Sequence, residues 1–310
     1  MTTQPRLLGS KGKLPTLSTK HILSIIKSRR FENAELIKQA EQFLTSQRPA
    51  VFILPKTHEP VILLVSGGLD SIIMWEVLLK EYQFKVYPLF LDKGEKRGSQ
   101  EWSSVNFFSN YFKEKYPKLF VEPFKQTAYI PQPEIINELQ TPFSSLDVSN
   151  TDFPSGTTVN IFLGSPGIVP FYAMTFARYL ELKNNIRIRT LFSSVMAGDG
   201  EFCPSQTLTS LRLINLSMCA FTGDYSWQFT SIALEKELGH FLTKTQLLDQ
   251  GMKYGLPVDK TWSCYQSLPL HCGSCLACQS RRAAFAESNH IDSTRYFNQL
   301  SWLEKVLSKL

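Results

Sequence analysis

An uninterrupted apolar run, Val61 to Val65, leads directly into the hexapeptide SGGLDS at residues 66–71. A continuous apolar run of this length is typical of a strand that is buried on both faces, as in a parallel sheet. Asp70 and Ser71 then begin a helical pattern, in which the apolar positions are Ile72, Ile73, Val77 and Leu78. A buried strand that turns into a helix at once predicts a β-α-β unit, and therefore an α/β fold.

The same alternation continues along the chain. A second strand is expected over 84–92, ending at Asp92, and it is followed by a helix over 99–115 and a short strand over 119–124. Later segments predict a helix over 171–182, a strand over 186–195 and a helix over 232–238. Strands that alternate with helices indicate a parallel sheet with right-handed crossovers.

The 310 residues, 43% of them hydrophobic, are enough for two domains or for one domain with an appendage. We expect a helical extension over 1–57, a main α/β domain over 58–255 and a cysteine-containing region over 256–310. A segment rich in Pro, Ser, Thr and Asn, around 125–165, is expected to be an insertion in the main domain.

Positive charge is concentrated at the N-terminus. The net charge is +6, and residues 1–30 hold no acidic residue but seven basic ones, Arg6, Lys11, Lys13, Lys20, Lys27, Arg29 and Arg30. This arm is either a solvated tail or a contact for an anionic partner. Since no apolar run reaches the ~18 residues of a membrane span and no signal peptide is evident, we expect a soluble, cytoplasmic protein that does not bind membranes.

The SGGLDS hexapeptide has the chemistry of an anion cradle. Gly67 and Gly68 allow positive φ and a close approach of backbone N–H groups to a ligand. Ser66 and Ser71 add hydroxyl groups, and the helix that follows directs its positive end at the same point. The hexapeptide is neither a Walker A loop, which needs a Lys, nor the dinucleotide pattern G-x-G-x-x-G.

Four of the six cysteines lie close together in the pattern C-x7-C-x2-C-x2-C, as Cys264, Cys272, Cys275 and Cys278. Four thiolates at this spacing suit one structural Zn²⁺ in a closed tetrahedral site. His271 is an alternative ligand, although its neighbour Cys272 fits the spacing better. The remaining two, Cys203 and Cys219, are expected to be buried thiols of the core.

The sequence motif S-G-G-x-D-S resembles the PP-loop of the ATP pyrophosphatase superfamily. That resemblance implies a five-stranded parallel sheet of the HUP-like type with helices on both faces, and a loop that holds the pyrophosphate part of ATP with Mg²⁺. It assigns ATP binding to Ser66, Gly67, Gly68, Leu69, Asp70, Ser71 and Asp92. It assigns catalytic roles to Ser66, Asp70 and Ser71.

The segment TWSCYQSLPLHCGSCLACQSRRAAF, starting at Thr261, resembles the C-terminal part of the QueC family, the 7-cyano-7-deazaguanine synthases. Members of that family adenylate 7-carboxy-7-deazaguanine with ATP, form an amide with ammonia, and convert the amide to a nitrile with a second ATP. The resemblance implies that the zinc site is structural.

Several positions depart from that family. Ile168 and Val169 stand in place of a polar Arg-Asn pair, and residues 202–206 match a family segment only weakly. The family's Lys-x-Glu, whose Lys contacts phosphate, becomes Lys244-Thr245-Gln246, so the resemblance assigns a catalytic role to Lys244. The N-terminal extension and the insertion have no counterpart in the short QueC enzymes. These departures resemble the QueC-like proteins of bacterial antiphage operons of the CBASS and Qat types.

Four functions remain open from the sequence. The first is a ligase that transfers the deazapurine acyl group to an amine, for example on a partner protein docked by the N-terminal extension, in antiviral defence. The second is a synthase of the free nitrile base. The third is a PP-loop enzyme that modifies tRNA, and the fourth is a binding protein with an inactive loop. A homodimer is compatible with each of them.

Overall fold

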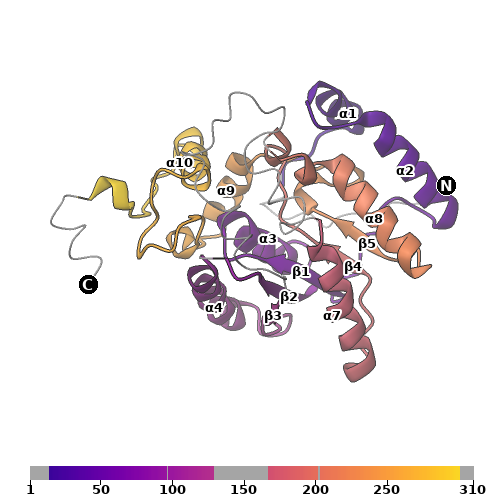
Figure 1. Cartoon of the computed structure of the whole chain (residues 1–310), viewed down its shortest axis with the longest axis horizontal. Coiled ribbons are helices and arrows are strands. Elements are labelled where there is room, and N and C mark those ends of the chain that lie inside the picture. The colour runs from indigo at the N-terminus through magenta and orange to yellow at the C-terminus, as the bar shows by residue number, and fades with distance from the viewer. Residues whose placement is uncertain (1–13, 96, 129–166, 202, 301–310) are drawn as a thin grey trace.

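The computed structural model describes residues 14–95, 97–128, 167–201 and 203–300 (Figure 1). The described part contains one five-stranded parallel sheet in the order β3-β2-β1-β4-β5. Its strands are β1 (Pro60–Val65), β2 (Lys85–Asp92), β3 (Phe124–Thr127), β4 (Thr190–Phe192) and β5 (Gln228–Thr230). The predicted fold class is confirmed, with the apolar run Val61–Val65 in the central strand.

The strand order indicates where along the carboxyl ends of the strands a ligand would bind. The chain runs from β1 outward to β2 and β3, and then returns to the other side of β1 with β4, which pairs through Ile62 with Leu191 and through Leu63 with Phe192. In open parallel sheets, ligands bind beyond the carboxyl ends of the strands at such a reversal of strand order. The segments that follow β1 and β4 are therefore the ones to inspect.

Helices cover both faces of the sheet (Figure 1). The described helices are α1 (Thr19–Ser28), α2 (Ala34–Gln47), α3 (Leu69–Lys80), α4 (Gly98–Lys115), α7 (Val169–Asn184), α8 (Leu208–Thr222), α9 (Lys244–Lys253) and α10 (Leu276–Ser288). Helices α3, α4, α9 and α10 share one apolar core, and α1, α2, α7 and α8 share another. None of the described helices has the length and apolar composition that a bilayer span requires.

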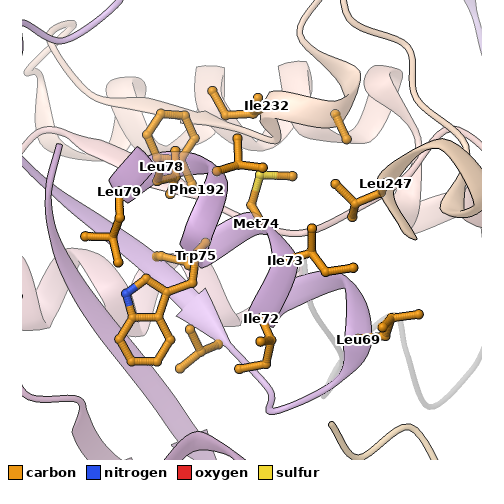
Figure 2. Packing of buried hydrophobic residues seen from close by; sticks show 14 of the residues in the cluster. Leu69, Ile72, Ile73, Met74, Trp75, Leu78, Leu79, Phe192, Ile232 and Leu247 are labelled. Carbon is orange, nitrogen blue, oxygen red and sulfur yellow. The ribbon is translucent and has the colours of Figure 1, made fainter. Parts of the chain in front are cut away.

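Central strand β1 contributes to both cores. Val61, Leu63 and Val65 face the core of α3, whereas Ile62 and Leu64 face the core of α7 and α8. This alternation follows from the two-residue period of a strand, and it explains why the run is apolar without interruption. Helix α3 is itself buried over nearly its whole length, and Figure 2 shows its side chains packed against Phe192, Ile232 and Leu247.

Three predicted elements differ from the structure. Strand β3 begins where the expected strand over 119–124 ends, because Leu119 and Phe120 still bond back to Tyr116 at the end of α4. Only Thr190–Phe192 of the strand expected over 186–195 is assigned to a strand, β4, which pairs with β1 and with the three residues of β5. The helix expected over 232–238 is two short 3₁₀ turns, separated by the extended residue Glu235.

Residues 14–57 are attached to the main domain. The carboxylate of Glu32 accepts hydrogen bonds from the N–H groups of Leu208 (2.8 Å) and Thr209 (2.9 Å), and so caps the N-terminus of α8. Arg29, one of the basic residues of the arm, pairs with Glu201. The first 13 residues and most of the expected insertion, from 129 to 166, lie outside the described residues.

A buried ion pair ties α8 to the segment after β5. Arg212 donates to both carboxylate oxygens of Glu235, at 2.7 and 3.0 Å, and to Glu41 of α2 at 2.9 Å. The side chains of Arg212 and Glu235 are 1% and 0% exposed. Their burial is acceptable only because each charge has a partner.

Glu235→Gln is therefore expected to lower the free energy of unfolding by about 3–5 kcal/mol, because it leaves the Arg212 guanidinium incompletely paired in the core. Urea denaturation at neutral pH measures the change. Glu237→Gln is the matched control, since the Glu237 side chain is 38% exposed and its partner Lys236 keeps a second carboxylate, Glu41, at 3.0 Å. Equal stability of the two variants would contradict the prediction.

Candidate functional site

The SGGLDS loop, Ser66–Ser71, lies between β1 and α3 at the carboxyl edge of the sheet. Gly67 has φ +72°, and a Cβ at this position would collide with the backbone carbonyl of Glu101 in α4. Ser104 of α4 donates to the Gly67 carbonyl at 2.8 Å. Both the backbone conformation and the close contact with α4 therefore require glycine at position 67.

The loop leaves the start of α3 free to bind an anion. Gly68 is the N-cap of α3, so no side chain caps the helix, and the first N–H groups of an α-helix have no partner within it. The hydroxyls of Ser66 and Ser71 lie 3.2 Å apart, and Ser71 also donates to the Gly68 carbonyl at 3.0 Å. These contacts fix the loop in a shape that suits the oxygens of a phosphate group.

Lys244 reaches the loop from α9. Its Nζ lies 3.0 Å from Oδ2 of Asp70 and 3.3 Å from Oγ of Ser280 in α10. Helix α9 starts here because Thr243 caps the Gln246 N–H, and the Gln246 side chain accepts from the Thr243 N–H at 3.0 Å. Gln246 thus fills a capping role, and the structure brings together the four residues that the sequence suggested as catalytic, Ser66, Asp70, Ser71 and Lys244.

Asp199 joins this cluster and was missed by the sequence analysis. It follows β4, and its Oδ2 accepts the Met196 N–H at 2.8 Å. Burial raises the pKa of Asp199 to about 6, with the negative charge of Asp70 acting in the same direction and Lys244 against it. Burial alone would lower the pKa of Lys244. The negative charges of Asp70 and Asp199 have the larger effect, so the pKa of Lys244 lies above its usual value. The sequence signal that could have identified Asp199 is its position shortly after β4, the strand that lies beside β1.

Asp92, a predicted ATP-binding residue, lies at the end of β2. Its Oδ2 pairs with Lys125 at 2.9 Å and its Oδ1 accepts the Gly94 N–H at 3.1 Å. The hydrogen bond from Lys125 lowers the pKa of Asp92. Within the described residues, none of the hydrogen bonds or ion pairs of Asp92 reaches the SGGLDS loop.

The four cysteines of the predicted metal site come together. The Sγ atoms of Cys264, Cys272, Cys275 and Cys278 lie within 4.8 Å of one another, and we call residues 264–278 the cysteine knuckle. Backbone N–H groups point at the sulfurs, for example from Cys272 to Cys264 Sγ at 3.2 Å. Gly273, at φ +79°, makes the turn, and a Cβ there would collide with Asn298.

The donor set fits a metal ion. Four thiolates are a complete ligand set for zinc or for an iron–sulfur centre. His271 is not part of this cluster of ligand atoms, and its Nε2 accepts the Ser263 N–H at 3.1 Å. The Sγ atoms of Cys272 and Cys278 are 3.9 Å apart, close to the ~3.8 Å edge of a tetrahedron with 2.3 Å Zn–S bonds.

The cysteine knuckle is joined to the SGGLDS loop. The Trp262 N–H donates to the Gly67 carbonyl at 2.8 Å. Arg281 of α10, 1% exposed, holds the same segment by donating to Thr261 Oγ1 at 2.7 Å and to the Val258 carbonyl at 2.8 Å. Arg281 therefore fixes the chain before the knuckle, and this chain segment contacts the loop through Trp262.

Three other predicted features have simple positions. Cys203 and Cys219 are both buried thiols, as expected, and burial raises the pKa of Cys219 to about 11. Ile168 precedes α7 and is 44% exposed. Val169 packs into the core of α7 and α8, so its side chain serves the fold.

Comparisons with known proteins identify relatives. A family model described as "Queuosine biosynthesis protein QueC" matches residues 173–289, a range that contains Asp199, Lys244 and the four cysteines but begins after the SGGLDS loop. A 7-cyano-7-deazaguanine synthase of Allorhizobium ampelinum is 41% identical over 70 residues, 22% of this chain and 30% of that protein. The synthase of Ruthia magnifica is 26% identical over 239 residues, 76% of this chain and 95% of that protein.

Among solved structures, the U34-tRNA thiolase NcsA of Methanococcus maripaludis, with its [4Fe-4S] cluster, matches 94% of this chain and 90% of its own, with 12% identity and a TM-score of 0.35. So weak a likeness adds nothing to the assignment of the fold or of the metal. The matched segment is 30% of the length of the first synthase and 95% of the second. Sequence identity is higher over the short match, 41%, than over the long one, 26%.

Proposed function

We propose that this QueC-like chain is an ATP-dependent enzyme that adenylates the carboxylate of 7-carboxy-7-deazaguanine and transfers the acyl group to an amine. The observation that carries the proposal is the junction of the SGGLDS loop with Lys244, whose Nζ lies 3.0 Å from Asp70. The QueC match supplies the substrate class, and it covers Lys244 and the cysteine knuckle.

The geometry supports cleavage between the α- and β-phosphates. A loop that offers a helix N-terminus, two hydroxyls and a lysine binds pyrophosphate as a unit. A carboxylate oxygen then attacks the α-phosphorus, the bond to the bridging oxygen breaks, and pyrophosphate leaves with the electron pair. The amine attacks the acyl carbon of the adenylate next, AMP leaves, and the nitrogen loses a proton. Lys244 would stabilise the charge that grows on the phosphates.

The loop also fits Mg²⁺. Oδ1 of Asp70 is buried and has no hydrogen-bond partner among the described residues, while Oδ2 pairs with Lys244. Mg²⁺ in nucleotide sites is held by one or two carboxylates together with phosphate oxygens, so the free oxygen of Asp70 suits it. When bound, Mg²⁺ neutralises negative charge on the leaving pyrophosphate.

For the cysteine knuckle we propose one structural Zn²⁺. The separation of 3.9 Å between two of the sulfurs matches a single tetrahedral ion, whereas an iron–sulfur cluster lies between its ligands and keeps them further apart. Four cysteine ligands leave no open position for substrate. The metal would hold the segment that carries Trp262 against Gly67.

We further propose that the amine belongs to a partner protein and that the reaction serves antiviral defence. The support is the departure from the short QueC enzymes, in which Ile168 and Val169 replace a polar pair and an N-terminal extension is added. Because residues 14–57 pack against the domain through Glu32 and Arg29, the extension offers a fixed surface to a partner.

A second candidate is the plain synthase that makes 7-cyano-7-deazaguanine from ammonia and two ATP. The names of the matching relatives favour it as directly as they favour the ligase. The two candidates share the first adenylation and differ in the acceptor and in the number of ATP molecules consumed.

The test incubates the protein with ATP, Mg²⁺ and 7-carboxy-7-deazaguanine. We expect AMP and pyrophosphate to form only when the carboxylate is present; ADP and phosphate as products would refute the loop assignment. With ammonium added, release of free nitrile and two AMP per product would establish the synthase. An intact-mass adduct on a partner protein, with one AMP per adduct, would establish the ligase.

A further inference from the structure

Tyr265 projects from the cysteine knuckle next to the reaction site. It follows Cys264 directly, its backbone N–H bonds to the sulfur of Cys275, and it is nevertheless 46% exposed. Three residues earlier, Trp262 bonds to the SGGLDS loop. The backbone is thus fixed on both sides while the residue as a whole stays 46% exposed, so its side chain is not enclosed by the core and is accessible to a ligand.

Arg97 supports the ring. The Arg97 guanidinium carbon lies 4.8 Å from the centre of the Tyr265 ring, within the range of a cation–π contact. Arg97 is itself held by two carboxylates, Glu95 at 3.1 Å and Glu101 at 3.0 Å. Because two carboxylates fix the guanidinium, and the guanidinium lies against the ring, a ligand would find the ring already in position.

The ring also lies within reach of the catalytic cluster. Glu101, which pairs with Arg97, packs against this cluster: its backbone carbonyl occupies the place that a Cβ of Gly67 would need, and Gly67 belongs to the SGGLDS loop. Lys244 in turn contacts Asp70 in the SGGLDS loop. Tyr265 is therefore linked to the SGGLDS loop by Arg97 and Glu101 through its ring, and by Trp262 through the chain.

We propose that Tyr265 is a positioning residue, whose ring, with Arg97 behind it, stacks against the planar fused heterocycle of a bound reactant. This inference rests on the proposed function, in which both reactants carry such a ring: the adenine of ATP and the base of 7-carboxy-7-deazaguanine. Stacking on an aromatic face tolerates either ring system, so the shared chemistry is recognised and the experiment separates the two sources.

The experiment compares wild type, Tyr265→Phe and Tyr265→Leu by isothermal titration calorimetry with three probes: MgATP, 7-carboxy-7-deazaguanine and inorganic pyrophosphate. We expect Tyr265→Leu to weaken binding of one heterocycle by about 5- to 150-fold, the loss that corresponds to one base–aromatic stack. Tyr265→Phe keeps the face of the ring and should bind as wild type does. Pyrophosphate has no ring, so its binding should be unchanged in both variants.

Weaker binding of MgATP alone assigns the stack to adenine, and weaker binding of the carboxylate alone assigns it to the substrate base. Equal binding of every probe by wild type and Tyr265→Leu would overturn the inference. An equal loss of affinity in Tyr265→Phe and Tyr265→Leu would also overturn it, because the hydroxyl and not the ring would then be the group that binds. Loss of pyrophosphate binding or of bound metal in Tyr265→Leu would mean a structural role and would also overturn it. If wild type binds none of the three, the proposed function fails instead.

Discussion

Replacing Lys244 with glutamine is expected to slow pyrophosphate formation by about a hundred- to a thousandfold, the usual cost of removing one group that stabilises transition-state charge. Lys244 is the one residue of the proposed catalytic set that reaches the loop from a distant helix, α9. The charge that grows on the α-phosphate and on the leaving pyrophosphate would lose its partner. The fold should survive, because the Lys244 side chain is 23% exposed.

The rate is measured as AMP formed from radiolabelled ATP with saturating 7-carboxy-7-deazaguanine. Lys253→Gln is the matched control, since it removes the same charge from the exposed last residue of α9. Lys244→Arg keeps the charge but not the shape, and an intermediate rate is expected. A Lys244→Gln enzyme as fast as Lys253→Gln would exclude a catalytic role for Lys244.

The central strand and its loop could be predicted because their signals are local. An uninterrupted apolar run predicts a strand that is buried on both faces, and the structure has such a strand at Pro60–Val65. Two glycines before Asp70 predict a turn with positive φ, which is found at Gly67. The four cysteines are equally plain, since they lie within 15 residues of one another and their sulfur atoms come together in the structure.

Other parts depend on partners that lie far away in the sequence. Helix α8 takes part of its N-terminal capping from Glu32, 176 residues before it, so its start had no complete local signal. The segment after β5 forms 3₁₀ turns, because the Glu235 side chain is drawn to Arg212 and its backbone is extended. Tertiary contacts of this kind override a local helical pattern.

The same reason explains the missed members of the site. Asp199 lies near Asp70 and Lys244 because β4 lies beside β1 in the sheet. The order of strands in a sheet cannot be predicted from any single segment of the sequence. Arg97 matters because it stacks on Tyr265, which arrives from the opposite end of the chain. The role of Asp92, by contrast, was carried over from a resemblance, and its observed partner is Lys125.

Removal of the metal is expected to have the largest effect on stability. Within residues 14–300 as far as the structure describes them, the apolar cluster around the cysteine knuckle is small, and its buried members are Cys264, Cys272, Cys278 and Tyr296. Binding of a structural zinc ion is worth about 10–16 kcal/mol in small metal sites, which is as large as the stability of a whole domain, about 5–15 kcal/mol. Without the ion, this small cluster cannot hold the segment that follows Trp262.

Cys278→Ser should therefore lose its metal, lower the melting temperature and precipitate readily, while Cys203→Ser, a buried cysteine outside the knuckle, should keep one ion per chain. Elemental analysis of anaerobically purified protein identifies the ion: zinc in a colourless sample is expected, and iron with a visible absorbance would contradict zinc. Because Trp262 donates to the Gly67 carbonyl, the soluble fraction of Cys278→Ser should also bind pyrophosphate less tightly. A metal-free variant that melts and binds pyrophosphate as wild type does would show that the knuckle does not support the loop.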